Sequence, residues 1–341
     1  MNTLAPAHRI AAADAVPAPR AAAQLDFHRT VSRKLVHKSA VSEVFLTDSE
    51  RAAGDRFLLA AQWPRDHAVF QPGPGGLTDS MVVVETARQA SIFVFHRYYG
   101  VPLDVPFLVR SMDFAITDLD ALAGSAGPQE VTLDLTVELP AGRSASRMPV
   151  LTRAVVRTAD GRPCAEVSMA GDILDRRIYQ RIRSRRAVPS ADRATARPDG
   201  PCTVEVPPAA VGRRRPGDVV LVPAGDDRWR LRVDQHHPTF FDHSSDHVQA
   251  VLLLEALRQY GMLTAEVRST RPSDVLCGLS VQFRGYAELD SDILLDPGPA
   301  AIAERSTEER VVRVRATQDG AVILSARLAF RSAWQHVSEE I

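Results

Sequence analysis

The chain has 341 residues, of which 45% are apolar and 24% are charged, a composition typical of a globular protein with about two domains. Its formal net charge of −1 provides no overall basic surplus for binding nucleic acid or an anionic membrane. No apolar run reaches the roughly 18 residues of a transmembrane helix, so we expect a cytoplasmic protein without a membrane or nucleic-acid partner. Cys164, Cys202 and Cys277 are far apart in the sequence, which favours reduced thiols.

The first part of the chain divides into a tail and one predicted domain. Residues 1–26 are rich in alanine and proline and are expected to be disordered. The first domain is predicted over residues 27–174, with a loop rich in proline and glycine at 64–77 and then a long apolar helix. The helix is expected to begin at Asp79 or Ser80, which are good N-cap residues. Strand-like segments are expected at 41–46, 57–63, 107–116, 131–139, 150–158 and 164–170.

A basic segment and a linker are expected between two domains, over residues 175–213. Asp175 to Arg186 reads DRRIYQRIRSRR and is predicted to be helical. It is interpreted either as a solvated connector or as a docking site for an acidic partner or a phosphate. The second domain, 214–341, is predicted to repeat the pattern of the first, with a helix from His247 to about Val267. Its strand-like segments are 218–222, 229–233, 275–286, 293–295, 311–317 and 321–330.

Two segments with the same polar stripe indicate that the chain contains one unit twice. Residues 251–259 read VLLLEALRQ, and residues 81–89 read MVVVETARQ. Wound as helices, both are apolar on most faces, and their Glu, Arg and Gln fall in one arc of roughly 100°. A helix of this kind is normally buried. Burying a Glu or Arg costs free energy unless the charge is paired or takes part in the function.

The repeat extends to the loop before each helix. An H-x-x-F motif begins at His67 and again at His237, an offset of 170 (237−67). Glu85 and Glu255 have the same offset (255−85). Each unit has one or two strands, a loop, one long apolar helix and several further strands. We therefore predict an α+β fold of two tandem hotdog domains, each a central helix wrapped by an antiparallel sheet. Together they are expected to form an intramolecular double hotdog, in a monomer (a pseudo-dimer) or a homodimer.

Several motifs in both halves carry a resemblance to a known family. In the first half they are Val36-His37-Lys38, Glu43-Val44-Phe45-Leu46-Thr47-Asp48, Trp63-Pro64-Arg65-x-His67 and Glu85-x-x-Arg88-Gln89; in the second they are Phe240-Phe241-Asp242-His243, Asp246-His247 and LLLEALRQ at 252–259. The two helix segments resemble the helix of β-hydroxyacyl-carrier-protein dehydratases. All the motifs together, in order over roughly residues 35–335, more closely resemble the A-factor biosynthesis family of γ-butyrolactone signal synthases.

The resemblance to the A-factor family implies an acyltransferase. A β-ketoacyl group would move from the thioester of an acyl carrier protein to the hydroxyl of dihydroxyacetone phosphate, and the phosphorylated ester would then cyclise to a butenolide. Related members make furan-type signals from the same intermediate. No cofactor is expected, and the glycine-rich segment 72–76 lacks the Lys and Ser/Thr of a phosphate loop. The alternatives are a hotdog dehydratase or thioesterase acting on acyl thioesters, or a non-catalytic acyl-binding protein.

Glu255, Arg258 and Glu85 are the predicted catalytic residues. Acyl transfer to an alcohol needs a base, and a carboxylate in an apolar cleft has a raised pKa that makes it a better base near neutral pH. The alternative is that each Glu only forms an ion pair with the Arg three residues later. The main chemistry is expected in the second half, because only there does a loop rich in Asp and His precede the helix.

The predicted substrate-binding residues are Arg88, Gln89, Gln259, His67, His237, His243 and His247. The Arg is expected to hold its Glu ionised or to bind the phosphate of the acceptor bidentately. The two Gln side chains are expected to donate to a thioester carbonyl or to hydrogen-bond a loop backbone. The histidines of the H-x-x-F motifs are expected to act with a Glu or to be structural. The Asp/His-rich loop shows no third ligand at a matching spacing, so no metal is expected.

No nucleophilic residue stands out in the sequence. There is no G-x-S-x-G motif, and none of the cysteines has a neighbouring His. We therefore expect direct transfer without an acyl-enzyme, with the thioester carbonyl polarised by backbone N–H groups at a helix N-terminus. The acyl chain needs an apolar tunnel, which the helices rich in Val and Leu are expected to line.

Overall fold

A computed structural model describes residues 25–124, 127–139, 144, 146–186, 206–225, 228–264, 274–298 and 309–333. The expectations for most of the N-terminal tail, for residues 187–205 of the linker and for the last residues of the second predicted helix fall outside these ranges. Within them, no helix combines the length and the apolar character needed to cross a membrane.

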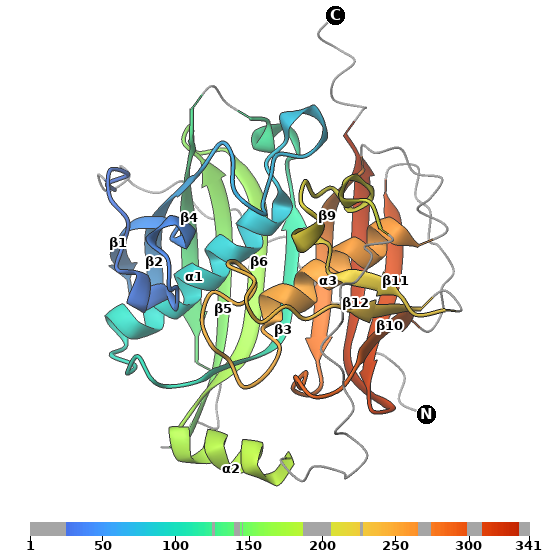
Figure 1. The fold of residues 1–341 in the computed structure, drawn as a ribbon. Helices are drawn as coiled ribbons and strands as arrows, with labels where there is room; N and C mark the ends of the chain where they lie inside the picture. The colour runs from blue at the N-terminus through green and yellow to red at the C-terminus, as the bar shows by residue number, and fades with distance from the viewer. Residues whose placement is uncertain are drawn as a thin grey trace, which may run out of the picture.

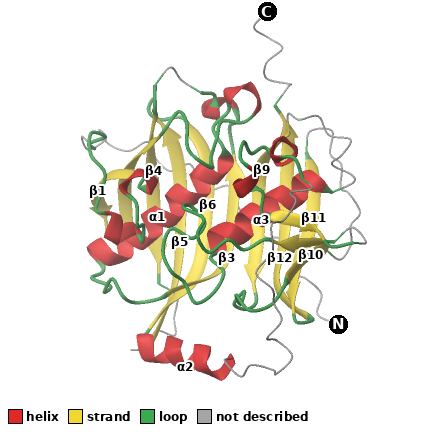
Figure 2. Ribbon diagram, viewed as in Figure 1, coloured by secondary structure: helices red, strands yellow, loops and turns green. Residues whose placement is uncertain are grey.

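The described chain forms one antiparallel sheet and three α-helices (Figures 1 and 2). The helices are α1 (Ser80–Tyr98), α2 (Arg176–Arg186) and α3 (Ala250–Leu263). The strands are β1 (Leu46–Ala53), β2 (Arg56–Trp63), β3 (Phe107–Ile116), β4 (Gln129–Glu138), β5 (Arg147–Thr158), β6 (Pro163–Leu174), β7 (Leu221–Pro223), β8 (Trp229–Leu231), β9 (Asp274–Phe283), β10 (Ile293–Pro297), β11 (Arg310–Gln318) and β12 (Ala321–Ser332).

The order of the strands shows that the two halves are related by an approximate two-fold axis. The order is β1-β2-β4-β5-β6-β3-β9-β12-β11-β10-β8-β7, so the second half repeats the first in reverse. The halves are joined by antiparallel pairing of β3 with β9, in which Asp113 lies opposite Ser280. These two residues are also equivalent positions of the repeat, since each is the seventh residue of its strand. The prediction of two tandem hotdog units in one continuous double hotdog is confirmed.

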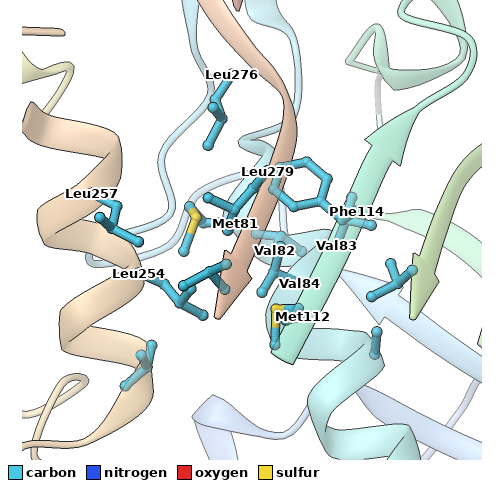
Figure 3. Close-up of a cluster of buried hydrophobic side chains, with 14 of the residues drawn as sticks. Met81, Val82, Val83, Val84, Met112, Phe114, Leu254, Leu257, Leu276 and Leu279 are labelled. Carbon is cyan, nitrogen blue, oxygen red and sulfur yellow. The ribbon is translucent and has the colours of Figure 1, made fainter. Parts of the chain in front are cut away.

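The two long helices lie against the same face of the sheet, as Figure 2 shows. Sixteen of the 19 residues of α1 and 12 of the 14 residues of α3 are buried, which explains why both helices are apolar nearly all round. Asp79 caps α1 by accepting a hydrogen bond from the backbone N–H of Met81, as the sequence predicts. Figure 3 shows side chains of α1, α3, β3 and β9 meeting in one apolar cluster where the halves join.

Two segments expected to be strands begin as 3-10 turns instead. Residues 41–43 and 216–218 are 3-10 helices, and the strands that follow begin at Leu46 and Leu221. The cause is the same in both halves, because a Gln of the long helix binds the backbone at this point. Gln89 donates to the carbonyl of Glu43 (2.8 Å), and Gln259 donates to that of Asp218 (2.7 Å). The backbone carbonyl is therefore taken by a side chain and is not available to a neighbouring strand.

Candidate functional site

Glu255 of α3 lies at the centre of a sealed ion-pair cluster. The residue is fully buried, and its carboxylate accepts five hydrogen bonds. Arg258 and Arg213 each donate two of them, at 2.6–2.9 Å, and Gln259 donates the fifth at 2.7 Å. Arg213 also donates to Asp79, the cap of α1, at 2.6 Å. A carboxylate whose two oxygens are both occupied by cations has no lone pair directed at a substrate.

Glu85 of α1 occupies the equivalent position in the first half. Arg88 donates two hydrogen bonds to it at 2.8 Å, and Gln89 donates a third at 2.9 Å. The Lys38 ammonium lies 3.1 Å from the carboxylate and 3.9 Å from Asp242, which comes from the loop of the other half. The first half therefore repeats the arrangement of the second, with a lysine where the second half has an arginine.

Lys38 and Arg213 are equivalent residues that the repeat at offset 170 does not reveal. They are separated by 175 positions (213−38), as are Glu43 and Asp218 (218−43), whose backbone carbonyls the two Gln side chains bind. The offset changes because the β1–β2 hairpin has eight-residue strands, whereas β7 and β8 have three residues each. Arg213 lies in the stretch expected to be linker, yet its side chain is only 1% exposed.

The expected rise in the pKa of the two helix carboxylates is wrong. Burial alone would raise the pKa of Glu255, but the charges of Arg213 and Arg258 lower it to about 2. Burial opposes ionisation of Glu85 as well, and the charges of Arg88 and Lys38 lower its pKa far below the usual range. Both groups are therefore held as carboxylates near neutral pH, and a carboxylate with a pKa near 2 is a poor base. The geometry favours the alternative reading of each as the centre of a buried ion pair.

The two loop histidines, His67 and His237, have the same structural surroundings. The Nδ1 atom of each accepts hydrogen bonds from two backbone N–H groups of its own loop, at 3.1–3.2 Å. The Nε2 atoms lie 3.2 Å from carboxylates, Glu43 for the first and Asp218 for the second. Each ring also stacks on the Phe of its H-x-x-F motif. Every polar atom of the two rings is occupied, so the motif fixes the turn of the loop.

One cavity of about 310 Å³ lies between the two halves. Its apolar wall includes Ile92, Phe95, Val150, Met169 and Leu253. Its polar wall comes from both halves: His37, Lys38 and Arg88 from the first, and Asp242, His243 and His247 from the second. The cavity is therefore amphipathic, with room for an acyl chain beside a group of charged and hydrogen-bonding side chains.

Arg88 is the member of the polar stripe that faces this cavity. Its side chain is 20% exposed, compared with 8% for the equivalent Arg258. Its Nε and Nη2 atoms bind Glu85, and Nη2 also approaches the carbonyl of Val36, whereas Nη1 has no hydrogen-bond partner among the described residues. A fixed guanidinium with an unused N–H edge can bind an anionic ligand.

Asp242 and His243 form an acid–imidazole pair at the cavity. The Nδ1 atom of His243 lies 2.6 Å from the carboxylate, and the imidazole side chain is 45% exposed. Burial alone would raise the pKa of Asp242, but its hydrogen bond with His243 and the charge of Lys38 lower it. The carboxylate orients the ring so that Nε2 is free to accept a proton.

A second pair, Asp246 and His247, lies farther along the same loop. The His247 Nδ1 atom is 2.7 Å from Asp246, whose carboxylate also accepts hydrogen bonds from Tyr179 and Arg183 of α2. Asp246 therefore ties α2 to the loop, whereas Asp242 is tied to the first half through the backbone N–H of Ser39.

His37 takes a backbone conformation that is uncommon for a residue other than glycine. Its φ of 53° lies in the left-handed region, where the equivalent residue of the second half is Gly212, with φ 62°. Its ring lies 2.8 Å from the Nε2 atom of His96, and Nδ1 of His96 lies 2.7 Å from the carbonyl of Val101. Burial and the nearby His96 and Arg88 lower the pKa of His37 to about 4, so its ring faces the cavity uncharged at neutral pH.

The N-termini of the two long helices differ in a way that affects the cavity. The first turn of α1 is capped by Asp79, whereas Gln249 before α3 makes no side-chain cap. Gln249, Ala250 and Val251 all line the cavity. The first N–H groups of a helix have no partner within it, so α3 presents unpaired donors and the positive end of its dipole to the cavity.

The structure separates the predicted site residues into two groups. Arg88, His243 and His247 line the cavity. Glu85, Glu255, Arg258, Gln89, Gln259, His67 and His237 do not line it and are bonded to other protein groups. Sequence analysis missed Lys38, Asp242 and His37 as cavity residues. The available signal was their presence in the motifs VHK and FFDH, which are part of the family resemblance but have no exact copy in the other half.

The fold and the cavity define a double-hotdog protein with one amphipathic site between its halves. Residues 20–175 and 194–333 match the model of the A-factor biosynthesis hotdog domain, and the chain belongs to that family. It is 34% identical to a "2-oxo-3-(phosphooxy)propyl 3-oxoalkanoate synthase" of Streptomyces virginiae, over 89% of this chain and 98% of the relative. A protein of the same name from Streptomyces coelicolor is also 34% identical, over 88% of this chain and 91% of the relative.

Among solved structures, a putative oleoyl thioesterase from Lactobacillus plantarum has a TM-score of 0.47 and 12% sequence identity. The match covers 81% of this chain and 95% of that chain.

The sealed cluster generates a prediction about stability. We expect Glu255→Gln to lower the free energy of unfolding at pH 7 by about 3–5 kcal/mol, because two buried guanidinium groups lose their counter-charge. Since the folded pKa of Glu255 is depressed to about 2 from 4.5, its stabilisation is complete above about pH 4.5. The difference in free energy of unfolding between the wild type and Glu255→Gln should shrink as the pH falls from about 4.5 towards 2.

Chemical denaturation at several pH values measures this difference. Glu138→Gln is the control, since its ion pair with Arg153 is half exposed on both sides and should contribute at most about 1 kcal/mol. A Glu255→Gln protein as stable as the wild type at pH 7, but without activity, would instead assign Glu255 to catalysis.

Proposed function

We propose that the protein transfers a β-ketoacyl group from an acyl carrier protein to the hydroxyl of dihydroxyacetone phosphate, in the biosynthesis of a γ-butyrolactone-type or related signal. The observation that carries this proposal is the 34% identity, over 88–89% of this chain, to synthases whose named product is a 2-oxo-3-(phosphooxy)propyl 3-oxoalkanoate. That name describes a β-ketoacyl ester of dihydroxyacetone phosphate. An acyl thioester and a hydroxyl acceptor are the simplest precursors of such an ester. We place the reaction in the cytoplasm, with the carrier protein.

The cavity offers a place for each part of the two substrates. The apolar wall formed by Ile92, Phe95 and Met169 suits the acyl chain, whose burial is favourable by about 0.8 kcal/mol per methylene. The free Nη1 edge of Arg88 suits the phosphate of the acceptor. The N–H groups at the start of α3 suit the thioester carbonyl, where negative charge develops in the transition state.

His243 is the proposed general base, and Asp242 positions it. The hydroxyl of the acceptor gives its proton to Nε2 of His243 while its oxygen bonds to the thioester carbon. The carbon–sulfur bond then breaks, and the departing thiolate takes the proton back from the imidazole. Atoms and charge balance without an acyl-enzyme, and the buried Cys164 and Cys277 are not needed as nucleophiles.

Glu85 and Glu255 have a structural role in this proposal. Glu85 holds Arg88 in the cavity wall. Glu255 binds Arg213 in the second half, and the resulting ion-pair cluster fills the equivalent position there. A dehydratase reaction through His67 or His237 finds no support, because Nδ1 of each ring is bonded to its own loop and Nε2 lies against the carboxylate of Glu43 or Asp218. A thioesterase would use the same base with water in place of the acceptor.

Product analysis tests the proposal directly. Purified protein, a β-ketoacyl carrier protein and dihydroxyacetone phosphate should yield the phosphorylated ester, detected by mass spectrometry. Omitting the acceptor should leave the thioester intact. Thioester loss that is equally fast without acceptor would identify a thioesterase, and absence of any product from several acyl chain lengths with folded protein would refute the transferase.

A substitution of the proposed base should act on the chemical step. We expect His243→Gln to lower kcat by about 10²–10⁴, the usual contribution of a general base. His236→Gln, at an exposed histidine of the same loop, is the matched control and should retain the wild-type rate. Thermal unfolding checks that both variants are folded. A wild-type kcat in His243→Gln would exclude this residue as the base.

A substitution of Arg88 should act on recognition of the phosphate. Arg88→Lys keeps the charge but loses the planar edge, so we expect KM for dihydroxyacetone phosphate to rise by about 10–100-fold. With unphosphorylated dihydroxyacetone as acceptor, the variant and the wild type should be similar. If both acceptors are affected equally, Arg88 supports the cavity and does not bind the phosphate.

A further inference from the structure

Helix α2 is an unusually basic element held in a fixed place. Its 11 residues, RRIYQRIRSRR, contain six arginines and no carboxylate, in a chain whose formal net charge is −1. In Figure 1 it lies below the lower end of the sheet, where it follows β6. The sequence leaves open whether this segment is a solvated connector or a docking site.

Specific contacts on one side of the helix fix α2 to the second half. The Tyr179 hydroxyl donates to Asp246 at 2.7 Å, and Arg183 donates to Asp246 at 3.0 Å and to Glu288 at 2.7 Å. The Arg183 guanidinium also lies 4.8 Å above the ring of Tyr286. Two anchors one turn apart hold a helix in a definite orientation, whereas a solvated connector would need neither.

Three of the other arginines, Arg176, Arg177 and Arg181, form an outward-facing surface, which we call the α2 face. All three are exposed, and at 100° per residue they span an arc of about 140° that excludes both anchors. Arg176 makes one ion pair, with Asp104, in which both side chains are about two-thirds exposed. Arg177 and Arg181 have no ion pair with a described residue. The face therefore carries uncompensated positive charge.

The anchored side of α2 is also part of the cavity wall. Tyr179 lines the cavity together with His247 and Tyr286, the residues it packs against. Asp172 lines the cavity too, and it is held by Arg110 and Arg147, whose side chains are about half exposed. A macromolecule bound to the α2 face would thus lie next to the site where its thioester must react.

We propose that the α2 face docks the acidic carrier protein that delivers the acyl thioester. This inference rests on the proposed acyl transfer. Charge complementarity identifies the kind of partner, because a concentrated positive face on a nearly neutral protein attracts a negatively charged one and speeds its encounter. The neighbouring cavity distinguishes a carrier protein from a nucleic acid, since only the carrier brings a substrate that enters it.

A comparison of two donors tests the proposal. The same β-ketoacyl group is supplied either on a carrier protein or on free pantetheine, with dihydroxyacetone phosphate as acceptor. The triple variant Arg176→Glu, Arg177→Glu, Arg181→Glu should raise KM for the carrier-borne donor at least about tenfold. Its KM and kcat for the pantetheine donor should match the wild type, which also shows that the variant is folded.

Two further variants separate charge from other effects. Replacing the same three residues by lysine keeps the charge and should keep most of the affinity for the carrier-borne donor. Arg315→Glu, at an exposed position on β11, should behave as the wild type with both donors. Raising the ionic strength should increase the wild-type KM for the carrier-borne donor and leave that for pantetheine unchanged, because exposed charges are screened by salt.

The outcomes distinguish failure of this inference from failure of the proposed function. If the wild type makes no ester from either donor, the acyl transfer itself is refuted. If the wild type uses both donors and the glutamate variant keeps its KM for the carrier-borne one, the docking surface is refuted. Equal losses with both donors would also overturn it, since they would assign the helix to the shape of the cavity.

Discussion

The whole arrangement depends on a buried carboxylate on the polar stripe of each long helix. Such a group is stable only because an Arg three residues later, a Gln four residues later and a cation from the preceding segment all bind it. The Gln also binds the segment before the first strand of its half. One carboxylate thus fixes the helix, the start of the sheet and the loop of the opposite half.

Duplication of this cluster allowed the two copies to diverge. In the second half, Arg213 occupies both oxygens of its Glu and reaches Asp79, so the cluster is closed on every side. In the first half, Lys38 makes one short contact, which leaves an edge of Arg88 facing a cavity. The two helix N-termini also differ: α1 is capped by a carboxylate, whereas α3 has no side-chain cap. The 310 Å³ cavity therefore combines the polar stripe of one half with the loop and helix N-terminus of the other.

This asymmetry changes the expected location of the chemistry. A Glu that is fully bonded and held ionised stabilises the fold, whereas an exposed imidazole oriented by a carboxylate remains able to exchange a proton. At the cavity, Nη1 of Arg88 and Nε2 of His243 have no hydrogen-bond partner among the described residues. The buried stripe and the proposed reactive groups are adjacent but distinct.

The amino-acid sequence by itself determined the duplication, the two buried helices and the hotdog architecture, because the period and polarity of VLLLEALRQ and MVVVETARQ are local properties. Motifs along the chain were also sufficient for the family. Only the tertiary structure decided which of the two stripes borders a cavity. That outcome depends on Lys38, Arg213 and Asp242, which lie far from the two Glu residues in sequence and reach them through folding. The pKa values followed the same contacts: burial alone would have raised them, and the cations that folding brings to each carboxylate lowered them.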